Sequence, residues 1–395
     1  MGEMTERLAK RVAGFGTSVF TEMSRLAVRH RAVNLGQGFP DFPGPDFVKE
    51  AAIQAIRADL SQYAVSHGTP RLRRAIAETW QRAYGRALDP ETEVSIGSGA
   101  TELILDAILG LVDPGDEVVL FEPFYDSYLP DVLMAGGIPR TITLQPPDWH
   151  FDRQALADLF TPRTRLILIN TPHNPTGKMF SREELAFIAS LCQRHDTLVV
   201  TDEVYEQIRF DGVEHVPMAT LPGMWERTLT INSTGKAFSM TGWKVGYAVG
   251  PPELNRAVRA THQFVTFSTS TPFQEATATA LETAAQTGYY EKLRREYTAR
   301  RDLLAGTLES AGLSTLPVQG SYFLLADLAG MGFPDDVSFC RYLTSEIGVA
   351  AIPPSAFYAD PARAPLLARF CFAKRDETLR AAAERLQKLR AARRA

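Results

Sequence analysis

Apolar positions fall along the chain in two patterns, short continuous runs of strand length and longer stretches with helical periodicity. The apolar run at residues 93–96 leads into residues 101–112, where apolar side chains recur every three or four positions. The alternation continues to residue 249, with further strand-length runs at 117–121, 140–144, 165–170, 197–202, 228–232 and 244–249. Ser181 and Glu184 form an S-x-x-E pattern that predicts a capped helix start. Strands that alternate with helices over this length predict a mostly parallel sheet with helices on both faces.

The sequence pattern changes after residue 251, where long predicted helices precede a few short predicted strands. Residues 253–284 and 290–311 are predicted to be helices, and a charged helix is predicted at 375–394. Short strands are expected at 322–325, 349–352 and 369–372. We therefore expect a three-layer α/β domain with a smaller α+β domain made from both chain ends. The expected division is 1–45 as an N-terminal arm and part of the small domain, 46–285 as the large domain and 286–395 as the C-terminal small domain.

Composition narrows the function classes before any motif is considered. The chain of 395 residues is 45% hydrophobic and 22% charged, which is typical of a folded globular protein. Its formal net charge of −4 provides no basic excess for nucleic acid, and no apolar run approaches the length of a membrane span. Cys192, Cys340 and Cys371 are too far apart for a C-x-x-C metal site and suit a reducing compartment. We therefore expect a cytoplasmic enzyme without a metal site, a nucleic-acid partner or a membrane anchor.

A glycine-rich turn follows the first predicted strand of the large domain. Residues 97–99, with the sequence Gly-Ser-Gly, lead into Ala100 and Thr101 at the start of a predicted helix. Small residues allow backbone N–H groups to approach an anion, and a helix N-terminus attracts negative charge. The segment therefore indicates a phosphate cradle, with an ordinary strand-to-helix turn as the alternative. A dinucleotide site is disfavoured because Glu102 stands where the third glycine of G-x-G-x-x-G belongs.

Polar side chains also follow two later predicted strands, at the sheet edge where ligands collect in doubly wound α/β folds. Asn174 lies in the loop after the strand at 165–170, although a proline-containing turn alone explains such a segment. Asp202 ends an apolar strand. Burial of its carboxylate is costly unless a cation or a strong donor faces it, but a helix N-cap is an equal alternative at this position.

A lysine in the sequence Ser-Thr-Gly-Lys follows another predicted strand. Lys236 stands between a glycine and apolar residues, which is poorly suited to a solvated surface charge. A desolvated lysine has a lowered pKa and can form a Schiff base with an aldehyde. The S-x-x-K pattern from Ser233 to Lys236 is shared with penicillin-binding acyltransferases, but the S-D-N and K-T-G motifs of those enzymes are absent.

One cofactor requires all of these groups together. Pyridoxal phosphate needs a lysine for its aldehyde, a carboxylate for its ring nitrogen, donors for its phenolic oxygen and an anion cradle for its phosphate. Lys236 and Asp202 supply the first two groups. Asn174 with Tyr205 supplies the donors, and residues 99–101 supply the cradle. The sequence therefore predicts pyridoxal phosphate as the cofactor.

Several strings run through the whole chain in a fixed order. They are NLGQGFPDF at 34–42, EPFYD at 122–126, TPHNPTG at 171–177, TDEVY at 201–205, STGK at 233–236, TGWK at 241–244 and RFCF at 369–372. With these strings the sequence resembles the class I pyridoxal-phosphate-dependent aminotransferases of fold type I. Within them it is most similar to the branch of kynurenine/glutamine transaminases, bacterial methionine aminotransferases and N-succinyldiaminopimelate aminotransferases. The resemblance implies a homodimer with active sites at its interface, and a ping-pong exchange between an L-amino acid and a 2-oxo acid.

The resemblance also implies roles around the cofactor. Lys236 would bind the aldehyde covalently and then shuttle the proton of the reaction, while Asp202 would keep the ring nitrogen protonated. Tyr205 and Asn174 would bond the phenolic oxygen, and the cofactor ring would stack on Tyr125. Catalytic roles are therefore expected for Lys236, Asp202 and Tyr205. The phosphate ligands implied in this way are Gly99, Ala100, Thr101, Ser233, Lys244 and, from a second subunit, Tyr63.

Arg369 is the substrate-binding residue that the resemblance implies. It would clamp the α-carboxylate, helped by Gly36 and Asn174, because a guanidinium can grip a carboxylate through two bonds. Kynurenine-preferring relatives carry a tryptophan where Ser18 aligns and a histidine where Ser268 aligns. Further substrate contacts are expected from Tyr125, Phe15, Ser18 and Phe267. This largely apolar set predicts methionine, glutamine, aromatic or kynurenine-like donors over aspartate.

Two other kinds of function stay open at this point. A cysteine-S-conjugate β-lyase or an aminocyclopropane-carboxylate-synthase-like lyase would use the same cofactor for a different reaction. A non-catalytic aminotransferase-like regulator is the remote alternative. Such regulators carry an N-terminal DNA-binding domain, whereas here the first matching string already begins at residue 34 and the chain is net acidic.

Overall fold

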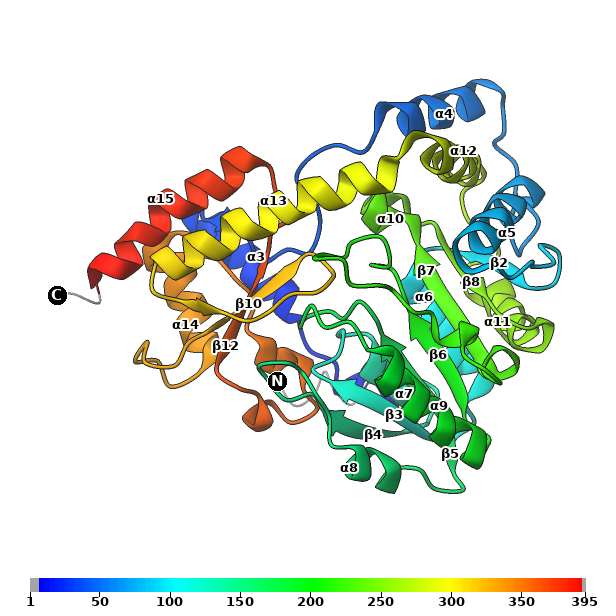
Figure 1. The fold of residues 1–395 in the computed structure, drawn as a ribbon, viewed down its shortest axis with the longest axis horizontal. Coiled ribbons are helices and arrows are strands. Elements are labelled where there is room, and N and C mark those ends of the chain that lie inside the picture. The colour runs from blue at the N-terminus through cyan, green and yellow to red at the C-terminus, as the bar shows by residue number, and fades with distance from the viewer. Residues whose placement is uncertain (1–6, 393–395) are drawn as a thin grey trace.

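The protein folds around a seven-stranded sheet, mostly parallel as the sequence pattern predicted (Figure 1). The computed structural model describes residues 7–392. The strands lie in the order β2 (Val94–Gly97), β8 (Gly246–Val249), β7 (Thr228–Ser233), β6 (Leu198–Asp202), β5 (Thr164–Asn170), β3 (Glu117–Glu122) and β4 (Ile138–Thr143). Neighbouring strands are parallel except at β8, which is antiparallel to both β2 and β7.

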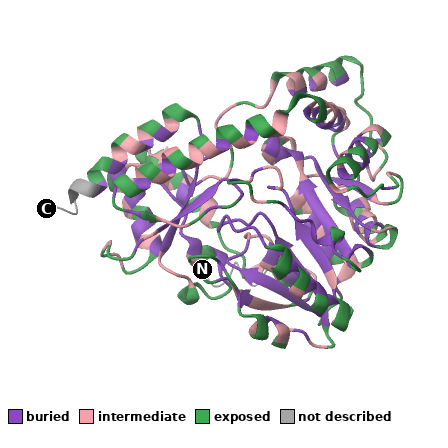
Figure 2. Ribbon diagram, in the orientation of Figure 1, coloured by how far each residue is buried: buried purple, intermediate pink, exposed green. Residues whose placement is uncertain are grey.

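Helices cover both faces of this sheet, because its central strands are apolar on both sides. Leu103 and Val258 pack with one face, and Leu156 and Leu185 pack with the other. Figure 2 shows the strands buried between the two helical layers. The helices of the first face are α6 (Ala100–Leu111), α7 (Tyr128–Met134) and α11 (Pro252–Val265), and those of the second face are α8 (Arg153–Asp158) and α9 (Arg182–His195).

The parallel register brings the ends of β5, β6 and β7 to one edge of the sheet. Asn170 pairs with Asp202 across β5 and β6, and Asp202 pairs with Ile231 across β6 and β7. Asn174 lies four residues beyond the end of β5, and Lys236 lies in the short helix α10 (Thr234–Ala237) that follows β7. The alternation read from the sequence therefore places the polar strand ends next to one another.

The predicted continuous helix over 253–284 is wrong, because the chain leaves the helical conformation between α11 and α12 (Thr271–Thr287). The carbonyl of His262 accepts the N–H groups of Thr266 and Phe267 at 3.1 and 2.8 Å, and Phe267 has a φ of 71°. Pro272 near the start of α12 also disfavours helical geometry just before it. α12 packs against α4 (Asp46–Arg57) and α5 (Pro70–Tyr84), neither of which the sequence pattern predicted.

A second, smaller set of elements joins the two ends of the chain. In it, β1 (Val33–Asn34) pairs in parallel with β11 (Val349–Ala350), so residues near the start of the chain lie with residues near its end. Figure 1 shows the long helix α13 leading from the large sheet to this region and running alongside α15. The remaining elements are α2 (Lys10–Ala13), α3 (Val19–His30), α13 (Tyr289–Ser310), β9 (Ser314–Thr315), β10 (Phe323–Asp327), α14 (Asp336–Tyr342), β12 (Leu367–Cys371) and α15 (Asp376–Ala392).

Local sequence signals fix the start of α9 as predicted. Ser181 Oγ accepts the N–H of Glu184 at 3.1 Å, and the Glu184 carboxylate accepts the N–H of Ser181 at 2.8 Å, which confirms the capping box.

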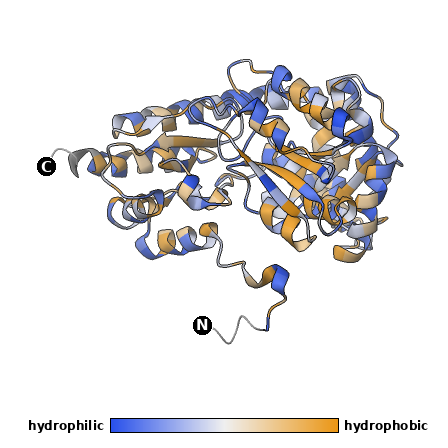
Figure 3. Cartoon of the chain, turned by 90° about the horizontal axis from the view of Figure 1, so that it is seen from below, coloured by the Kyte–Doolittle hydropathy of each residue, from blue (hydrophilic) through white to orange (hydrophobic). Residues whose placement is uncertain are grey.

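Apolar side chains concentrate in the interior of the molecule. Figure 3 shows apolar colour along the strands of the large sheet. Within residues 7–392, no helix is both long and apolar enough to cross a membrane.

Candidate active site

A small cavity lies at the edge where β5, β6 and β7 end. Its wall combines the turn before α6 with the strand ends and the loop before α7. Seven of the sixteen site residues expected from the sequence are brought together here. The lining residues are Ala100, Thr101, Ile104, Tyr125, Asn170, Asn174, Asp202, Val204, Tyr205 and Lys236.

Asp202 presents a buried carboxylate to this cavity. The hydroxyl of Tyr128 donates to its Oδ2 at 2.6 Å, and the N–H of Val204 donates to its Oδ1 at 3.3 Å. Burial raises the pKa of Asp202, while the hydrogen bonds and the charge of Lys236 act in the opposite direction. A buried carboxylate with two donors on it is suited to holding a cationic N–H group.

Lys236 faces Asp202 from the next strand end. Burial lowers the pKa of its amine to about 8, although the negative charge of Asp202 opposes this shift. The Nζ atom lies 5.5 Å from the ring centroid of Tyr205 and 5.8 Å from that of Tyr322. An amine that loses its proton near neutral pH can act as a nucleophile toward an aldehyde.

The turn before α6 is shaped by close contact with Lys244. Gly99 has a φ of 85°, and a Cβ atom added to it would lie 3.1 Å from Lys244 Nζ. A Cβ atom at Gly246 would lie 2.6 Å from the backbone carbon of Gly99, so β8 also approaches this turn closely. The first N–H groups of α6, at Ala100 and Thr101, have no acceptor within the helix. Together with the Lys244 amine they are suited to binding an anion.

Ser233 forms hydrogen bonds with backbone groups of the same chain. Its hydroxyl donates to the carbonyl of Val245 at 3.1 Å and accepts the N–H of Gly235 at 3.2 Å. One lone pair of the oxygen is engaged in this way, so its position is fixed before any ligand binds.

Arg369 is fully buried, at 0% exposure, and no carboxylate of the described residues forms a salt bridge with it. Its Nη1 donates to Asn174 Oδ1 at 2.9 Å and its Nη2 donates to the Gly36 carbonyl at 3.0 Å, while Nε has no partner among the described residues. Burial lowers the pKa of this guanidinium to about 10. A buried, charged guanidinium with a free donor is prepared to receive an anion.

Nine of the sixteen expected site residues are not among those that line the cavity: Gly36, Gly99, Ser233, Lys244, Arg369, Tyr63, Phe267, Ser18 and Phe15. Tyr63 is 80% exposed, and its ring meets the half-exposed ring of Phe267 edge-on at 5.0 Å. Ser18 caps the start of α3 by accepting the N–H of Thr21, and Phe15 precedes it at the surface. The cavity of a single chain is therefore formed without them.

The sequence analysis did not identify Tyr128 as a partner of Asp202, and it did not predict the hydrogen bonds that Asn170 makes. Asn170 Nδ2 donates to the carbonyl of Asp202 at 2.8 Å, and its Oδ1 accepts the N–H of Asn174 at 2.7 Å. It thereby ties two strand ends and the following loop together. Its position as the last, polar residue of an apolar strand was the available signal, whereas the contact of Tyr128 spans 74 residues.

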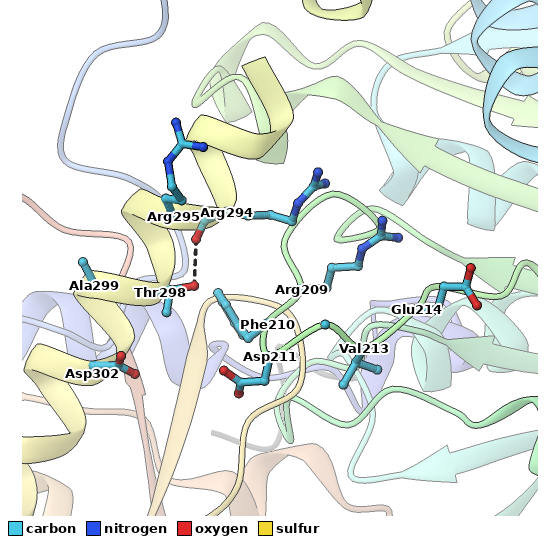
Figure 4. A pocket seen from close by; sticks show the side chains of 11 residues that line it. Arg209, Phe210, Asp211, Val213, Glu214, Arg294, Arg295, Thr298, Ala299 and Asp302 are labelled. Atoms are coloured by element: carbon cyan, nitrogen blue, oxygen red, sulfur yellow. Dashed lines mark hydrogen bonds between the residues drawn. The ribbon is translucent and has the colours of Figure 1, made fainter. Parts of the chain in front are cut away.

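A larger cleft lies elsewhere, between α13 and residues 209–214 (Figure 4). Arg209, Arg294 and Arg295 line it together with Asp211, Glu214 and Asp302, so charges of both signs share its wall. Neither Lys236 nor Asp202 lines this cleft. The small cavity at the strand ends is the better candidate for an active site.

The residues present fit pyridoxal phosphate. Asp202 is a buried carboxylate that could pair with a protonated ring nitrogen, burial lowers the pKa of Lys236, and the turn at Gly99 lies close to the Lys244 amine, as a phosphate site requires. The three-layer fold and this site together define a pyridoxal-phosphate-dependent enzyme of fold type I.

The comparison with protein families gives the particular family. Residues 30–386 match the family model for aminotransferase class I and II, and the chain belongs to this family. It is therefore a pyridoxal-phosphate-dependent aminotransferase, which confirms the resemblance seen in the sequence. The lyase and regulator alternatives are not favoured.

Three relatives extend over nearly the whole chain. A kynurenine–oxoglutarate transaminase of Dictyostelium discoideum is 44% identical over 98% of this chain and 97% of its own length. The structure of a methionine aminotransferase from Escherichia coli has a TM-score of 0.93, with 42% identity over 96% of this chain and 99% of that one. The structure of N-succinyldiaminopimelate aminotransferase from Mycobacterium tuberculosis also has a TM-score of 0.93, with 48% identity over 97% of this chain and 100% of that one.

Proposed function

We propose that the protein moves the amino group of an L-amino acid with a neutral side chain to a 2-oxo acid by a ping-pong reaction. The surroundings of Arg369 carry this proposal. Its guanidinium carbon lies 4.0 Å from the ring centroid of Phe323 and 5.1 Å from those of Phe20 and Phe357. A substrate whose α-carboxylate pairs with Arg369 therefore has apolar rings beside it, which favours methionine, glutamine, aromatic and kynurenine-like donors.

The names of two of the three relatives, a kynurenine–oxoglutarate transaminase and a methionine aminotransferase, support this range. The third is named for N-succinyldiaminopimelate, which carries further carboxylates, so this compound is included in the test below. In the sequence, no second arginine stands in a matched position to pair with a side-chain carboxylate of the substrate. Aspartate is thus expected to be a poor donor.

The proposed residue roles follow from the contacts in the cavity. When bound, pyridoxal phosphate supplies an electron-withdrawing ring that stabilises negative charge on the substrate Cα. Asp202 would hold a proton on the ring nitrogen, and hydrogen bonds from Tyr128 and Val204 orient its carboxylate. Asn174 and Tyr205 would bond the phenolic oxygen and Tyr125 would lie against the ring, since all three line the cavity.

Lys236 is proposed to bind the cofactor aldehyde and then to move the proton at Cα. A general base works best when its pKa lies near the operating pH, and a pKa of about 8 meets this condition. The phosphate is proposed to lie on the N–H groups of Ala100 and Thr101, next to Ser233 and Lys244.

We also propose a homodimer in which Tyr63 reaches the phosphate in the partner's site. A group of exposed apolar side chains supports this arrangement, because soluble monomers rarely expose such a patch. They come from α4, the loop after it and the end of α11: Ile53, Ile56, Leu60, Tyr63, Val65, Phe264, Val265 and Phe267.

A cytoplasmic location is proposed as well. Its support is that Cys192, Cys340 and Cys371 are all free and buried, as is usual in a reducing compartment.

The test of the proposed function is a half-reaction with each of the twenty amino acids and with N-succinyldiaminopimelate. The visible absorbance of the lysine-bound cofactor is followed as the donor consumes it. Methionine, glutamine and the aromatic amino acids are expected to react at least about tenfold faster than aspartate, since one mismatched buried polar group costs that much. A fastest reaction with aspartate or with N-succinyldiaminopimelate would contradict the proposed substrate class.

A further inference from the structure

His262 in α11 is buried behind the phosphate-binding turn, in contacts that the proposed chemistry does not use. Its Nδ1 lies 2.6 Å from Glu102 Oε1, and its Nε2 lies 2.9 Å from the backbone carbonyl of Ser66. A carbonyl only accepts hydrogen bonds, so Nε2 carries a proton. The imidazole therefore bridges α6 to the loop between α4 and α5.

Glu102 connects this bridge to the phosphate site. It is the third residue of α6, and its second carboxylate oxygen accepts the backbone N–H of Ser98 in the turn before the helix. Burial would raise the pKa of Glu102, but the hydrogen bonds from His262, Thr266 and Ser98 outweigh burial and lower it. The carboxylate is therefore charged, and it fixes the backbone from which the N–H groups of Ala100 and Thr101 project.

The other end of the bridge is the loop that carries Tyr63. Besides the contact of Ser66 with His262, the carbonyl of Gln62 accepts from Thr271 Oγ1 at 2.7 Å and that of Ala64 accepts from Ser268 Oγ at 3.2 Å. The Tyr63 side chain itself is exposed, so these backbone contacts determine where it points.

Asp106, one helical turn after Glu102, completes the surroundings of His262. Its Oδ2 is 3.7 Å from His262 Nδ1, and both of its carboxylate oxygens are buried without a hydrogen-bond partner among the described residues. Burial and then the charge of Glu102 raise the pKa of Asp106 to about 8. The pKa of Glu102 is lowered and that of Asp106 is raised, so Glu102 is the more acidic carboxyl of the two, and it is also the one in hydrogen-bond contact with His262.

We propose that Glu102, His262 and the Ser66 carbonyl form a positioning link between the phosphate cradle of one subunit and the Tyr63 loop that it presents to its partner. The inference rests on the proposed dimer in which Tyr63 reaches the partner's cofactor phosphate. Through this link, each chain sets the geometry of the phosphate site on both sides of the interface. His262 and Glu102 are thus positioning residues that touch neither substrate nor cofactor.

The first test measures the dissociation constant of pyridoxal phosphate from the cofactor-free dimer by titration of its visible absorbance. His262→Leu and Glu102→Gln are each expected to raise this constant about tenfold, since each leaves a buried polar group unpaired. His150→Gln is the matched control, because His150 makes the same kind of contact with Asp148, at 2.6 Å, but on the exposed surface. Glu102→Gln preserves side-chain size, so it keeps the test valid if His262→Leu does not fold. An unchanged constant in a folded variant would overturn the link.

The second test uses mixed dimers to separate the two ends of the link. Lys236→Ala in one chain leaves a single site that can bind the cofactor to lysine. In the first mixed dimer, His262→Leu is in the chain that keeps Lys236, so it alters the phosphate cradle of the remaining site. In the second, His262→Leu is in the Lys236→Ala chain, so it alters the Tyr63 loop that this chain presents to the remaining site. Weaker cofactor binding in both dimers is expected. A defect only in the first would overturn the role of the loop. A wild-type protein that binds no cofactor or does not transaminate would instead contradict the proposed function.

Discussion

The hydroxyl of Tyr128 donates a 2.6 Å hydrogen bond to Oδ2 of Asp202, and both side chains are buried. Burial raises the pKa of Asp202, and the bond from Tyr128 is the strongest contact that acts against this rise. Tyr128 therefore helps to keep the carboxylate charged in surroundings that disfavour charge. It supports the residue proposed to hold the proton of the cofactor ring.

Tyr128→Phe is expected to lower kcat by about tenfold or more, because a hydrogen bond to a charged group contributes about 1.5–3 kcal/mol. Steady-state kinetics with methionine measures the effect, and KM should change little. Tyr84→Phe is the matched control, since Tyr84 donates a 2.8 Å bond to Glu206 away from the cavity. A kcat that is equal in both variants would mean that Tyr128 does not support Asp202.

Arg369→Lys is expected to raise KM for the amino donor and for the 2-oxo acid by about a hundredfold each. The lysine keeps the charge but loses the fork that grips a carboxylate through two bonds, and both substrates use the same site. Initial-rate measurements with each substrate varied in turn check this. Arg301→Lys serves as control, because Arg301 pairs with Asp211 at the surface. An effect on only one of the two substrates would contradict a shared carboxylate site.

Attachment of the cofactor to the cofactor-free protein is expected to accelerate with pH and to level off above a midpoint near 8. Only the neutral amine of Lys236 attacks an aldehyde, and burial lowers its pKa to about 8 from the usual 10.5. Below the midpoint the ammonium form dominates and the rate falls about tenfold per pH unit. Stopped-flow absorbance over pH 6–10 (about four units, spanning this pKa) measures the profile. A midpoint near the ordinary lysine value would show that Lys236 is solvated.

Gly99→Ala is expected to weaken cofactor binding by about tenfold or more. The new methyl group would lie 3.1 Å from Lys244 Nζ, and the φ of 85° strains any residue with a Cβ atom by about 1–3 kcal/mol. Gly115→Ala separates the two effects, because Gly115 has a φ of 94° but nothing within 4 Å of its added Cβ atom. Equal binding constants in the two variants would mean that the turn does not hold the phosphate.

The strand ends that form the site could be predicted from the sequence because a polar residue at the end of an apolar run is a local feature. Asp202 and Asn170 each end an apolar run, and parallel pairing then places them side by side. The helix over 253–284 was predicted too long, because the turn at 266–270 depends on Phe267 adopting a positive φ, which the pattern does not encode; Pro272 was the available local signal. The domain boundaries at residues 45 and 285 stay predictions, as do the individual roles of the site residues.

Contacts between distant segments could not be predicted from the pattern. The bond from Tyr128 to Asp202 requires the start of α7 to lie near the end of β6, and the bridge from His262 to Ser66 spans 196 residues. Neither residue belongs to a motif. Such contacts depend on how helices pack on the sheet, which periodicity does not encode.

Replacement of Lys236 by alanine tests the central claim most directly. The purified Lys236→Ala protein is incubated with pyridoxal phosphate, methionine and a 2-oxo acid, and both the visible band of the lysine-bound cofactor and product formation are measured. The account predicts a folded protein that lacks this band and has lost at least about a thousandfold in turnover, the scale of removing a general acid–base group. Transamination at the wild-type rate by this variant would contradict it.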